Sequence, residues 1–238
     1  MKALILAAGR GERMRPLTDH TPKPLLMVRG KPLIVWHIEA LAQGGVREIV
    51  INTAWLEERI VDALGDGSRH GVSLRYSLEG RDHGGALETA GGIAKALPLL
   101  TDASSDCFWV VSGDVFLPGF RFDADAADRF ARSAALAHLW LVPNAPHHPK
   151  GDFGIDANGL ASRTAEPRFT WASAGLFRAS LVAGVPVGQE LPLTPLLQAG
   201  ADAGRISAER YDGPWTDVGT VERLNALNPP PGPGADSG

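Results

Sequence analysis

The chain has 238 residues, 44% of them hydrophobic, and its 23 basic and 27 acidic side chains leave a formal net charge of −4. A chain of this length can bury a substantial single core, so we expect a globular protein. The near balance of charges supplies no global field for a polyanion, which argues against nucleic-acid partners. Its single cysteine, Cys107, excludes an intramolecular disulfide and a cysteine-rich metal site.

Hydropathy predicts no membrane association. No apolar run approaches the roughly 20 residues of a membrane-spanning helix. The first strand also gives way to an Ala/Gly loop too early for a signal peptide. We therefore expect a cytoplasmic protein, which agrees with the low cysteine content.

The first 142 residues alternate apolar, β-prone runs with segments of helical periodicity. We predict strands over residues 3–6, 48–52, 73–77, 107–112 and 138–142. Residues 32–45 and 56–67 repeat apolar side chains at helical spacing and stop at glycine, as helices often do. Alternation of strand and helix predicts parallel pairing, and nearly continuous apolar strands suit a sheet that is covered on both faces. The predicted fold class is α/β, a three-layer sandwich with a mostly parallel, Rossmann-like central sheet.

The composition changes after about residue 143. A segment rich in Pro, Gly, Asp and Asn precedes a strand-like run at 171–177, a short helix at 193–204, a strand-like run at 206–215 and a last helix at 221–225. We expect these elements to form a small antiparallel region beside the parallel sheet. Residues 1–228 are predicted to form a single domain, and the Pro/Gly-rich residues 229–238 a disordered tail.

The loop after the first strand, GRGERMRPLTDHTPKPL, is the clearest candidate site. Parallel α/β sheets bind ligands at the carboxyl ends of their strands, where this loop lies. It is not the dinucleotide fingerprint, because Met14 replaces the third glycine, and it is not a P-loop, because no GK[ST] follows. The backbone amides of Gly9 and Gly11 can approach phosphates closely, and the arginines suit charge-assisted contacts. The sequence therefore predicts an anion site, with a solvated surface turn as the alternative.

The stretches LAAGRGERMRPLT and PKPLLMVRGKPLI resemble the signature of the sugar-1-phosphate nucleotidyltransferases. The resemblance continues in the family's order through LETAGGI, VVSGDV, SAGLF and WTDVGT, and it covers residues 1–225. It implies a fold of the nucleotide-diphospho-sugar transferase type. Residues 1–142 would form the nucleotide-binding region, and residues 143–228 the region that binds the sugar phosphate.

The reaction of such an enzyme explains the cations of the opening loop. A sugar 1-phosphate oxygen attacks the α-phosphorus of a nucleoside triphosphate and pyrophosphate leaves, so two polyanions must be brought together. The resemblance implies that Arg13 clamps the β- and γ-phosphates, and that Lys23 serves the α-phosphate and the incoming sugar phosphate as a compact point charge. The surface alternative stays open for Arg10 and Arg15. The other expected contacts of the triphosphate are Ala8, Gly9, Gly11 and Glu12.

Two aspartates are the expected ligands of a magnesium ion. Asp114 follows an apolar strand at its carboxyl end, where a metal ligand is expected in this architecture, although it could instead cap a turn. Magnesium usually takes one or two protein carboxylates, and the resemblance supplies Asp217 as the second. Asp217 could otherwise cap the last helix. The strand that ends in Asp114 also offers Ser112 as a nucleotide contact. We expect Arg13, Lys23 and Asp114 to be the catalytic residues.

Recognition of the base and the sugar rests on the later motifs. In LETAGGI, Thr89, Gly91 and Gly92 are expected to contact the nucleobase, with a helix N-terminus as the alternative. The chain reads Ala-Glu-Pro-Arg at 165–168, where many relatives carry Glu-Lys-Pro, so Arg168 or another group must replace that lysine, or the contact is absent. The family's sugar-phosphate contacts match Asp152, Glu166, Ala174 and Gly175.

The adjacent His147 and His148 lie in a proline-flanked loop without a third ligand, so we expect a surface turn there.

Within the family, the compact length and several stretches look most like bacterial enzymes that use UTP and N-acetylmuramate 1-phosphate in peptidoglycan recycling. Mannose-1-phosphate guanylyltransferases and glucose-1-phosphate thymidylyl- or uridylyltransferases are the alternatives. A regulatory subunit of the same fold without activity is also conceivable, but the chain retains Arg13, Lys23, Asp114 and Asp217. The expected partners are the two small-molecule substrates. Without a long C-terminal extension, we expect a monomer or a homodimer.

Overall fold

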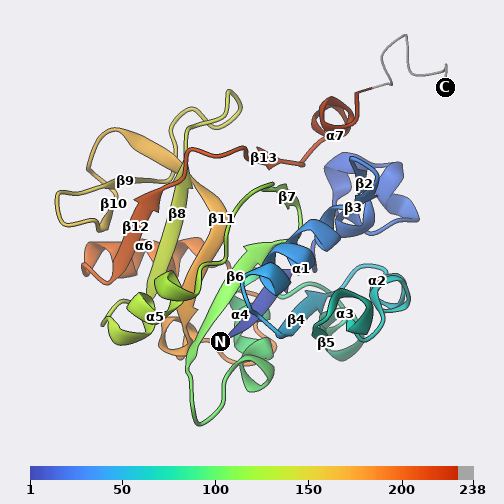
Figure 1. The fold of residues 1–238 in the computed structure, drawn as a ribbon, viewed down its shortest axis with the longest axis horizontal. Coiled ribbons are helices and arrows are strands. Elements are labelled where there is room, and N and C mark those ends of the chain that lie inside the picture. Colours follow the sequence, from blue (N-terminus) through green and yellow to red (C-terminus); the bar gives the residue numbers. More distant parts are fainter. Residues whose placement is uncertain (230–238) are drawn as a thin grey trace.

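A nine-stranded sheet forms the centre of the molecule in the computed structural model, which describes residues 1–229 (Figure 1). The tail predicted at 229–238 lies, except for its first residue, outside the described residues. The strands of the sheet are β1 (Lys2–Leu6), β4 (Glu48–Thr53), β5 (Ser73–Leu78), β6 (Cys107–Ser112), β8 (Ala137–Val142), β9 (Phe153–Ile155), β10 (Ala161–Ser162), β11 (Arg168–Arg178) and β12 (Ile206–Arg210).

The first half of the sheet is parallel, as the sequence predicts. Strand β1 lies between β4 and β6 and runs parallel to both, and β5 extends the sheet beyond β4. The register pairs Leu6 of β1 with Ser112 of β6 and with Asn52 of β4. These three strands therefore deliver their following residues to one edge of the sheet.

The second half of the sheet is mixed. Strand β11 runs antiparallel between β6 and β8, and the short strands β9 and β10 continue the sheet antiparallel beyond its first residues. The expectation of antiparallel pairing was wrong for β12, which runs parallel to β8. The chain reverses direction along β11 and again through α6 (Thr194–Asp202) before β12, so β12 returns in the direction of β8.

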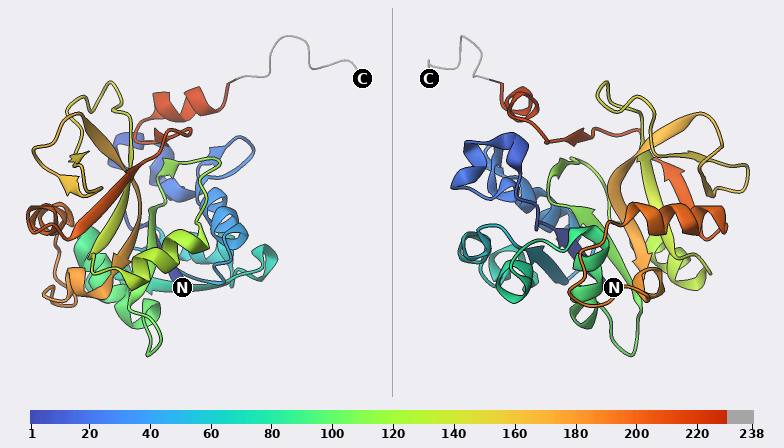
Figure 2. Two further views of the ribbon diagram at one scale, coloured as in Figure 1. Left: turned by 60° about the vertical axis from the view of Figure 1, so that its left-hand side comes forward. Right: turned by 180° about the vertical axis from the view of Figure 1, so that it is seen from behind.

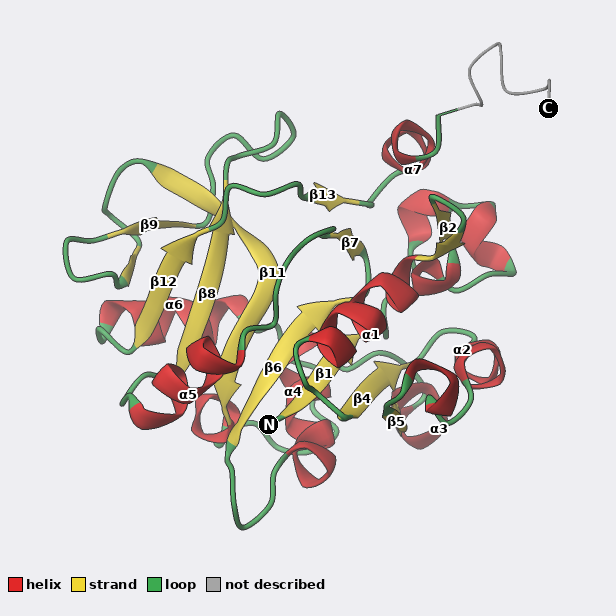
Figure 3. Ribbon diagram, in the orientation of Figure 1, coloured by secondary structure: helices red, strands yellow, loops and turns green. Residues whose placement is uncertain are grey.

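Helices cover both faces of the sheet (Figures 2 and 3). Alternate residues of each strand serve opposite faces: Ala3 and Ile5 pack with α1, α2 and α5, whereas Leu4 packs with α4 and α6. In the described residues no helix is long and apolar enough to cross a membrane. The helices are α1 (Leu33–Gln43), α2 (Glu57–Leu64), α3 (Glu79–His83), α4 (Glu88–Leu100), α5 (Ala124–Arg132), α6 (Thr194–Asp202) and α7 (Val221–Leu227).

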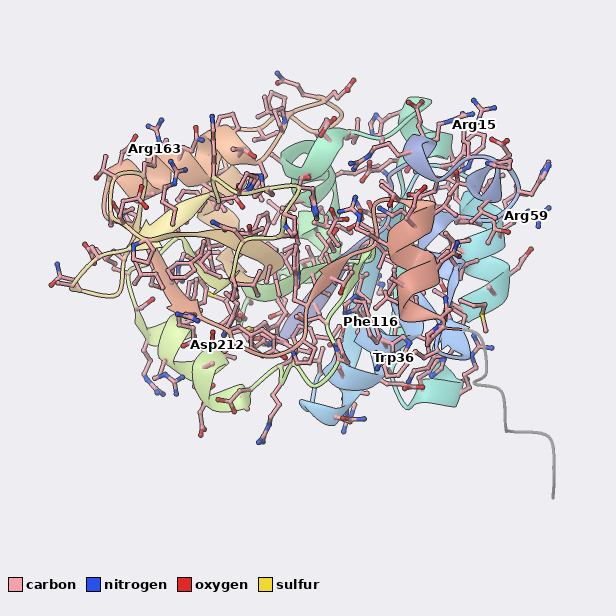
Figure 4. All side chains as sticks on the ribbon, turned by 90° about the horizontal axis from the view of Figure 1, so that it is seen from above. Arg15, Trp36, Arg59, Phe116, Arg163 and Asp212 are labelled. Carbon is pink, nitrogen blue, oxygen red and sulfur yellow. The ribbon has the colours of Figure 1, made fainter. Side chains whose placement is uncertain are left out.

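A third apolar cluster joins the opening segment to the end of the described chain. Met14, Leu26 and Val28 pack there with Phe116 and with the apolar face of α7. Figure 4 shows Trp36 of α1 beside Phe116, and their rings meet edge to face with centroids 5.2 Å apart. Two small antiparallel pairs frame this cluster: β2 (Met27–Val28) with β3 (Lys31–Pro32), and β7 (Val115–Phe116) with β13 (Thr216–Asp217).

Packing of the sheet explains one of the glycines singled out by the motifs. Gly175 lies in β11 between β6 and β8, and a Cβ there would stand 2.8 Å from the carbonyl oxygen of His138 and 2.9 Å from the Phe177 ring. Neither neighbour can withdraw without disturbing the sheet. We therefore expect Gly175→Ala to lower the free energy of unfolding by about 1–3 kcal/mol.

Chemical denaturation of the purified protein measures this effect. Gly184→Ala is the matched control, because a Cβ at Gly184 meets nothing within 4 Å and its backbone is not left-handed. It should change stability by less than about 0.5 kcal/mol. Equal stabilities for the two variants would contradict the packing role of Gly175.

Candidate active site

The opening loop is held in shape by its own residues. Gly11 has a φ of +69°, and a Cβ there would lie 3.0 Å from the Thr18 side chain and 3.2 Å from Cβ of Lys23. The Thr18 hydroxyl donates a hydrogen bond of 2.9 Å to the Gly11 carbonyl oxygen. Glycine is therefore required at 11 both by backbone conformation and by space. Gly9 differs, since a Cβ at that position would enter open space.

Lys23 and Asp114 form an ion pair at the centre of the candidate site. Lys23 is 7% exposed, and its Nζ donates to Oδ2 of Asp114 over 2.7 Å. The hydroxyl of Ser112 donates to Oδ1 of the same carboxylate over 2.7 Å. Burial raises the pKa of Asp114, but the Lys23 ammonium and the hydrogen bonds from Lys23 and Ser112 outweigh it and hold the pKa below its ordinary value. Asp114 is therefore ionised at neutral pH.

A cavity of about 420 Å³ opens between the loop and α4. Its walls combine the end of β1, the opening loop, the ion pair and the first turn of α4. Of the residues expected to bind the nucleotide, only Gly91 and Gly92 are absent from its walls. The lining residues are Leu6, Ala7, Ala8, Gly9, Gly11, Glu12, Arg13, Lys23, Pro24, Asn52, Ala86, Glu88, Thr89, Ser112, Asp114 and Gly219.

A second cavity of about 570 Å³ lies beside the first, over the antiparallel region of the sheet. The two cavities share three residues, Arg13, Ser112 and Asp114. Two ligands could therefore lie in separate cavities and meet at one common wall. The second cavity is lined by Arg13, Ser112, Asp114, Val115, His147, His148, Gly151, Asp152, Phe153, Arg168, Thr170, Trp171, Ser173, Thr194, Leu197, Gln198, Trp215 and Asp217.

The cations of the opening loop have different surroundings. Arg13 is exposed on the shared wall, and no carboxylate of the described residues pairs with it. Arg10 instead lies over the Trp55 ring, with its guanidinium carbon 4.0 Å from the ring centroid. Arg15 pairs with Asp19 over 2.7 Å and projects from the outer surface (Figure 4). Of these cations and Lys23, only Arg13 and Lys23 line the first cavity, where they can face an anion.

Asp217 lies close to Asp114 in the fold although 103 residues separate them in sequence. Strand β13 pairs Asp217 with Val115, and the amide of Val218 donates to the carbonyl oxygen of Asp114 over 3.0 Å. The Asp217 carboxylate accepts a hydrogen bond of 2.8 Å from Arg223. It does not cap α7, because Thr220 is the N-cap of that helix.

The two carboxylates fit a magnesium site, because this ion needs only one or two protein carboxylates and takes its other ligands from water and substrate phosphates. Asp114 and Asp217 both line the second cavity. No group of three metal-binding side chains gathers among residues 1–229, so a site built wholly from protein ligands is absent there.

The segment expected to contact the nucleobase divides between the cavity wall and the core. Thr89 lines the first cavity, at the second position of α4. Gly91 and Gly92 lie behind the wall: a Cβ at Gly91 would meet the Gln189 carbonyl oxygen at 2.2 Å, and one at Gly92 would meet the Glu79 carboxylate at 2.6 Å. These two glycines permit close packing and do not line the cavity.

A buried acid stands behind the first cavity. Glu79 is fully buried and accepts hydrogen bonds from Asn52 Nδ2 over 2.7 Å and from the Leu87 amide over 2.8 Å. Asn52 Oδ1 accepts in turn from the amide of Ala7 over 2.9 Å. Burial raises the pKa of Glu79, and the two hydrogen bonds offset some of that shift. This chain of contacts fixes the start of the opening loop relative to the entry of α4.

The expected contacts of the sugar phosphate are similarly divided. Asp152 lines the second cavity, but its carboxylate already accepts from the Trp171 amide over 2.8 Å and faces the His148 ring at 3.1 Å. Glu166 is exposed outside the cavity, and Ala174 and Gly175 are buried within β11. The roles assigned to these residues in binding stay predictions.

Several lining residues carried no usable signal in the sequence. His147 and His148 belong to the wall of the second cavity, where a surface turn was expected, and His147 lies 3.4 Å from the Asp217 carboxylate. Ser173 enters the cavity at a bulge of β11, where its φ is +57°. A bulge changes the direction of a side chain, but no sequence pattern predicts where a bulge occurs. In the sequence, only the motif SAGLF indicated that this region belongs to the site.

Comparisons with known proteins identify the family of the chain. A profile of the family described as nucleotidyl transferase matches residues 2–170. The N-acetylmuramate alpha-1-phosphate uridylyltransferase of Neisseria meningitidis is 49% identical over 231 residues, which cover 94% of this chain and 95% of that protein. The UTP--glucose-1-phosphate uridylyltransferase of Synechocystis is 31% identical over 93% of this chain, which spans 61% of its length.

A solved structure confirms the predicted fold class. A proposed glucose-1-phosphate thymidylyltransferase from Bacillus anthracis superposes with a TM-score of 0.79 at 23% identity, and the match covers 96% of this chain and 94% of that one.

A buried histidine supports the strand that follows Asp114. Nε2 of His37 lies 2.8 Å from the carbonyl oxygen of Val115, and burial lowers the pKa of His37 from 6.5 to about 4. His37 therefore becomes protonated below pH 6.5 in the unfolded chain, but only below about pH 4 in the folded chain. Stability should fall across this window by about 3 kcal/mol on account of His37.

The variant His37→Gln isolates this contribution, because an amide can still donate to Val115 but does not titrate. Urea unfolding at pH 7.5 and at pH 4.5 should show a smaller loss of stability in the variant than in the wild type. Parallel losses in the two proteins would contradict a neutral, buried His37.

Proposed function

Because the chain belongs to the nucleotidyl transferase family, we propose that it joins UTP and N-acetylmuramate 1-phosphate to give the UDP-sugar and pyrophosphate. The relative that is 49% identical along nearly the whole chain acts, by its name, on N-acetylmuramate 1-phosphate as a uridylyltransferase. The prediction of an enzyme is thereby confirmed. The observation that carries the proposal is the wall of Arg13, Ser112 and Asp114 that the two cavities share.

The chemistry requires positioning and charge neutralisation. An anionic oxygen of the sugar phosphate attacks the α-phosphorus, a bond forms between them, and the bond from that phosphorus to the bridging oxygen breaks as pyrophosphate leaves. The attacking oxygen carries no proton at neutral pH, so no general base is needed. Lys23 would hold the α-phosphate and the attacking phosphate, and Arg13 would neutralise the pyrophosphate end. Backbone amides at Gly9 and Gly11 would contact the triphosphate.

We propose that Asp114 and Asp217 hold a magnesium ion, which when bound would neutralise phosphate charge and orient the reacting groups. Both carboxylates face the second cavity and each already lies beside a cation, Lys23 in one case and Arg223 in the other. The two cations orient the carboxylates in the free enzyme, and Lys23 also holds the pKa of Asp114 below its ordinary value.

The nucleotide would occupy the first cavity, which is formed by Gly219 and by residues of the proposed nucleotide-binding region, 1–142. The sugar phosphate would occupy the second cavity, and residues 143–228 would contribute most of its walls. A cytoplasmic place in peptidoglycan recycling accords with these substrates, since both are soluble phosphates.

Activity assays with a panel of substrates test the proposed function. The purified protein with magnesium should release pyrophosphate from UTP and N-acetylmuramate 1-phosphate at a higher kcat/KM than from GTP and mannose 1-phosphate or from dTTP and glucose 1-phosphate. Release from GTP and mannose 1-phosphate alone would replace the proposed substrates with those of a guanylyltransferase. No release with any pair would refute catalysis.

Substitutions in the ion pair test the mechanism. Lys23→Met and Asp114→Asn should each lower kcat by at least about 100-fold, because each removes a charge that acts on the reacting phosphates. Arg15→Ala is the control, since its guanidinium pairs with Asp19 outside the cavities. It should keep nearly normal rates. Circular dichroism and thermal melting check the fold, and near-normal turnover in Lys23→Met would exclude its proposed role.

A further inference from the structure

Arg168 lies in the wall of the second cavity, in the part of that wall formed by the antiparallel region of the sheet. Arg168 is the first residue of β11 and pairs with Gly154 of β9. Arg168 lines the cavity, as do Asp152, Thr170 and Trp171.

Arg168 has no acidic partner within the described chain. Its Nη2 donates to two main-chain carbonyl oxygens, those of Asp152 over 2.6 Å and Gly151 over 3.4 Å. Its Nε is buried, and neither Nε nor Nη1 has a hydrogen-bond partner among residues 1–229. A half-buried cation without a counter-ion is costly, and a guanidinium whose Nη1 has no partner among the described residues fits an anionic ligand.

The carboxylates of Asp152 and Glu166 are turned to other groups. The Asp152 side chain accepts from the Trp171 amide and faces the His148 ring. The Glu166 carboxylate accepts from the main-chain amide of Arg168 over 3.0 Å and forms no ion pair with its guanidinium. The charge of Arg168 is therefore left for the cavity.

The position of Arg168 argues against the reacting phosphates as its ligand. The antiparallel register of β11 and β6 ends with Ala174 opposite Val111, and the next residue of β6 is Ser112, which belongs to the wall shared by the two cavities. Arg168 comes on the other side of the bulge in β11 and pairs with Gly154 of β9, not with β6. An anion bound at Arg168 would thus lie toward the far end of a ligand whose phosphate sits at the shared wall.

We propose that Arg168 is a specificity-determining residue that binds the carboxylate of an acidic sugar 1-phosphate. The inference rests on the proposed function, because N-acetylmuramate differs from N-acetylglucosamine by a lactyl ether that carries a carboxylate. The terminal nitrogen Nη1, which has no partner among the described residues, can donate a charge-assisted hydrogen bond to a carboxylate oxygen. A neutral sugar leaves Arg168 without a counter-ion, so the enzyme favours the acidic sugar by the energy of this charge-assisted contact.

Two substrates that differ only in the lactyl group test this role. The rates with N-acetylmuramate 1-phosphate and N-acetylglucosamine 1-phosphate, both with UTP and magnesium, are measured for the wild type, Arg168→Met and Arg168→Lys. Arg168→Met should lower kcat/KM for the acidic sugar between about 10- and 100-fold, mostly through KM, and change it less than about threefold for the neutral sugar. Arg168→Lys should recover some of the loss.

The control is Arg163→Met, which removes an exposed arginine of the same region of the molecule that pairs with Asp202 (Figure 4). Its rates with both sugars and its KM for UTP should match those of the wild type. Thermal melting of Arg168→Met shows whether the fold persists.

Each other outcome overturns a different statement. Equal losses with both sugars would show that Arg168 serves the phosphate or the fold and refute the inference while the proposed function stands. Unchanged rates with both sugars would also refute it. A wild type that uses neither sugar would overturn the proposed function, and the inference with it.

Discussion

The ion pair between Lys23 and Asp114 is the contact on which the arrangement of the site depends. It joins the opening loop to the end of β6 across 91 residues of sequence, over 2.7 Å. Lys23 is nearly buried, and its side-chain stem lies against Gly11. If the loop shifted, Lys23 and Asp114 would each lose the charged partner that they have here. Breaking the pair would leave the buried Lys23 ammonium without its counter-ion, whereas the Asp114 side chain is 40% exposed and can be solvated. The pair therefore fixes both the shape of the loop and the ionised state of Asp114.

The parallel sheet supplies the place for this contact. Strands β1 and β6 are in register, with Leu6 opposite Ser112, so the residues that follow both strands emerge side by side. The antiparallel β11 then continues the sheet on the other side of β6 and carries the second cavity. Two cavities on neighbouring regions of one sheet can share a wall, which a reaction between two phosphorylated ligands needs.

The motifs located the site to within a few residues but did not say which atoms face it. Gly91 and Gly92 stand in a motif that borders the first cavity, and yet they pack against Gln189 and Glu79. Gly175 likewise allows β11 to approach its neighbours. A sequence motif includes residues that pack behind the cavity wall as well as residues that face the ligand. Close packing restricts the size of a side chain as strongly as contact with a ligand does.

The sequence by itself determined the alternation of strands and helices, the anion-binding character of the opening loop, and the family, because periodicity and local residue types express these features. The tertiary structure alone decided that β12 runs parallel to β8 and that Asp217 lies beside Val115. It also decided that Arg168 faces a cavity without a counter-ion among the described residues, whereas Arg15 is paired at the surface. Pairing partners and the direction of a side chain depend on contacts between segments far apart in the chain, and no local pattern encodes them.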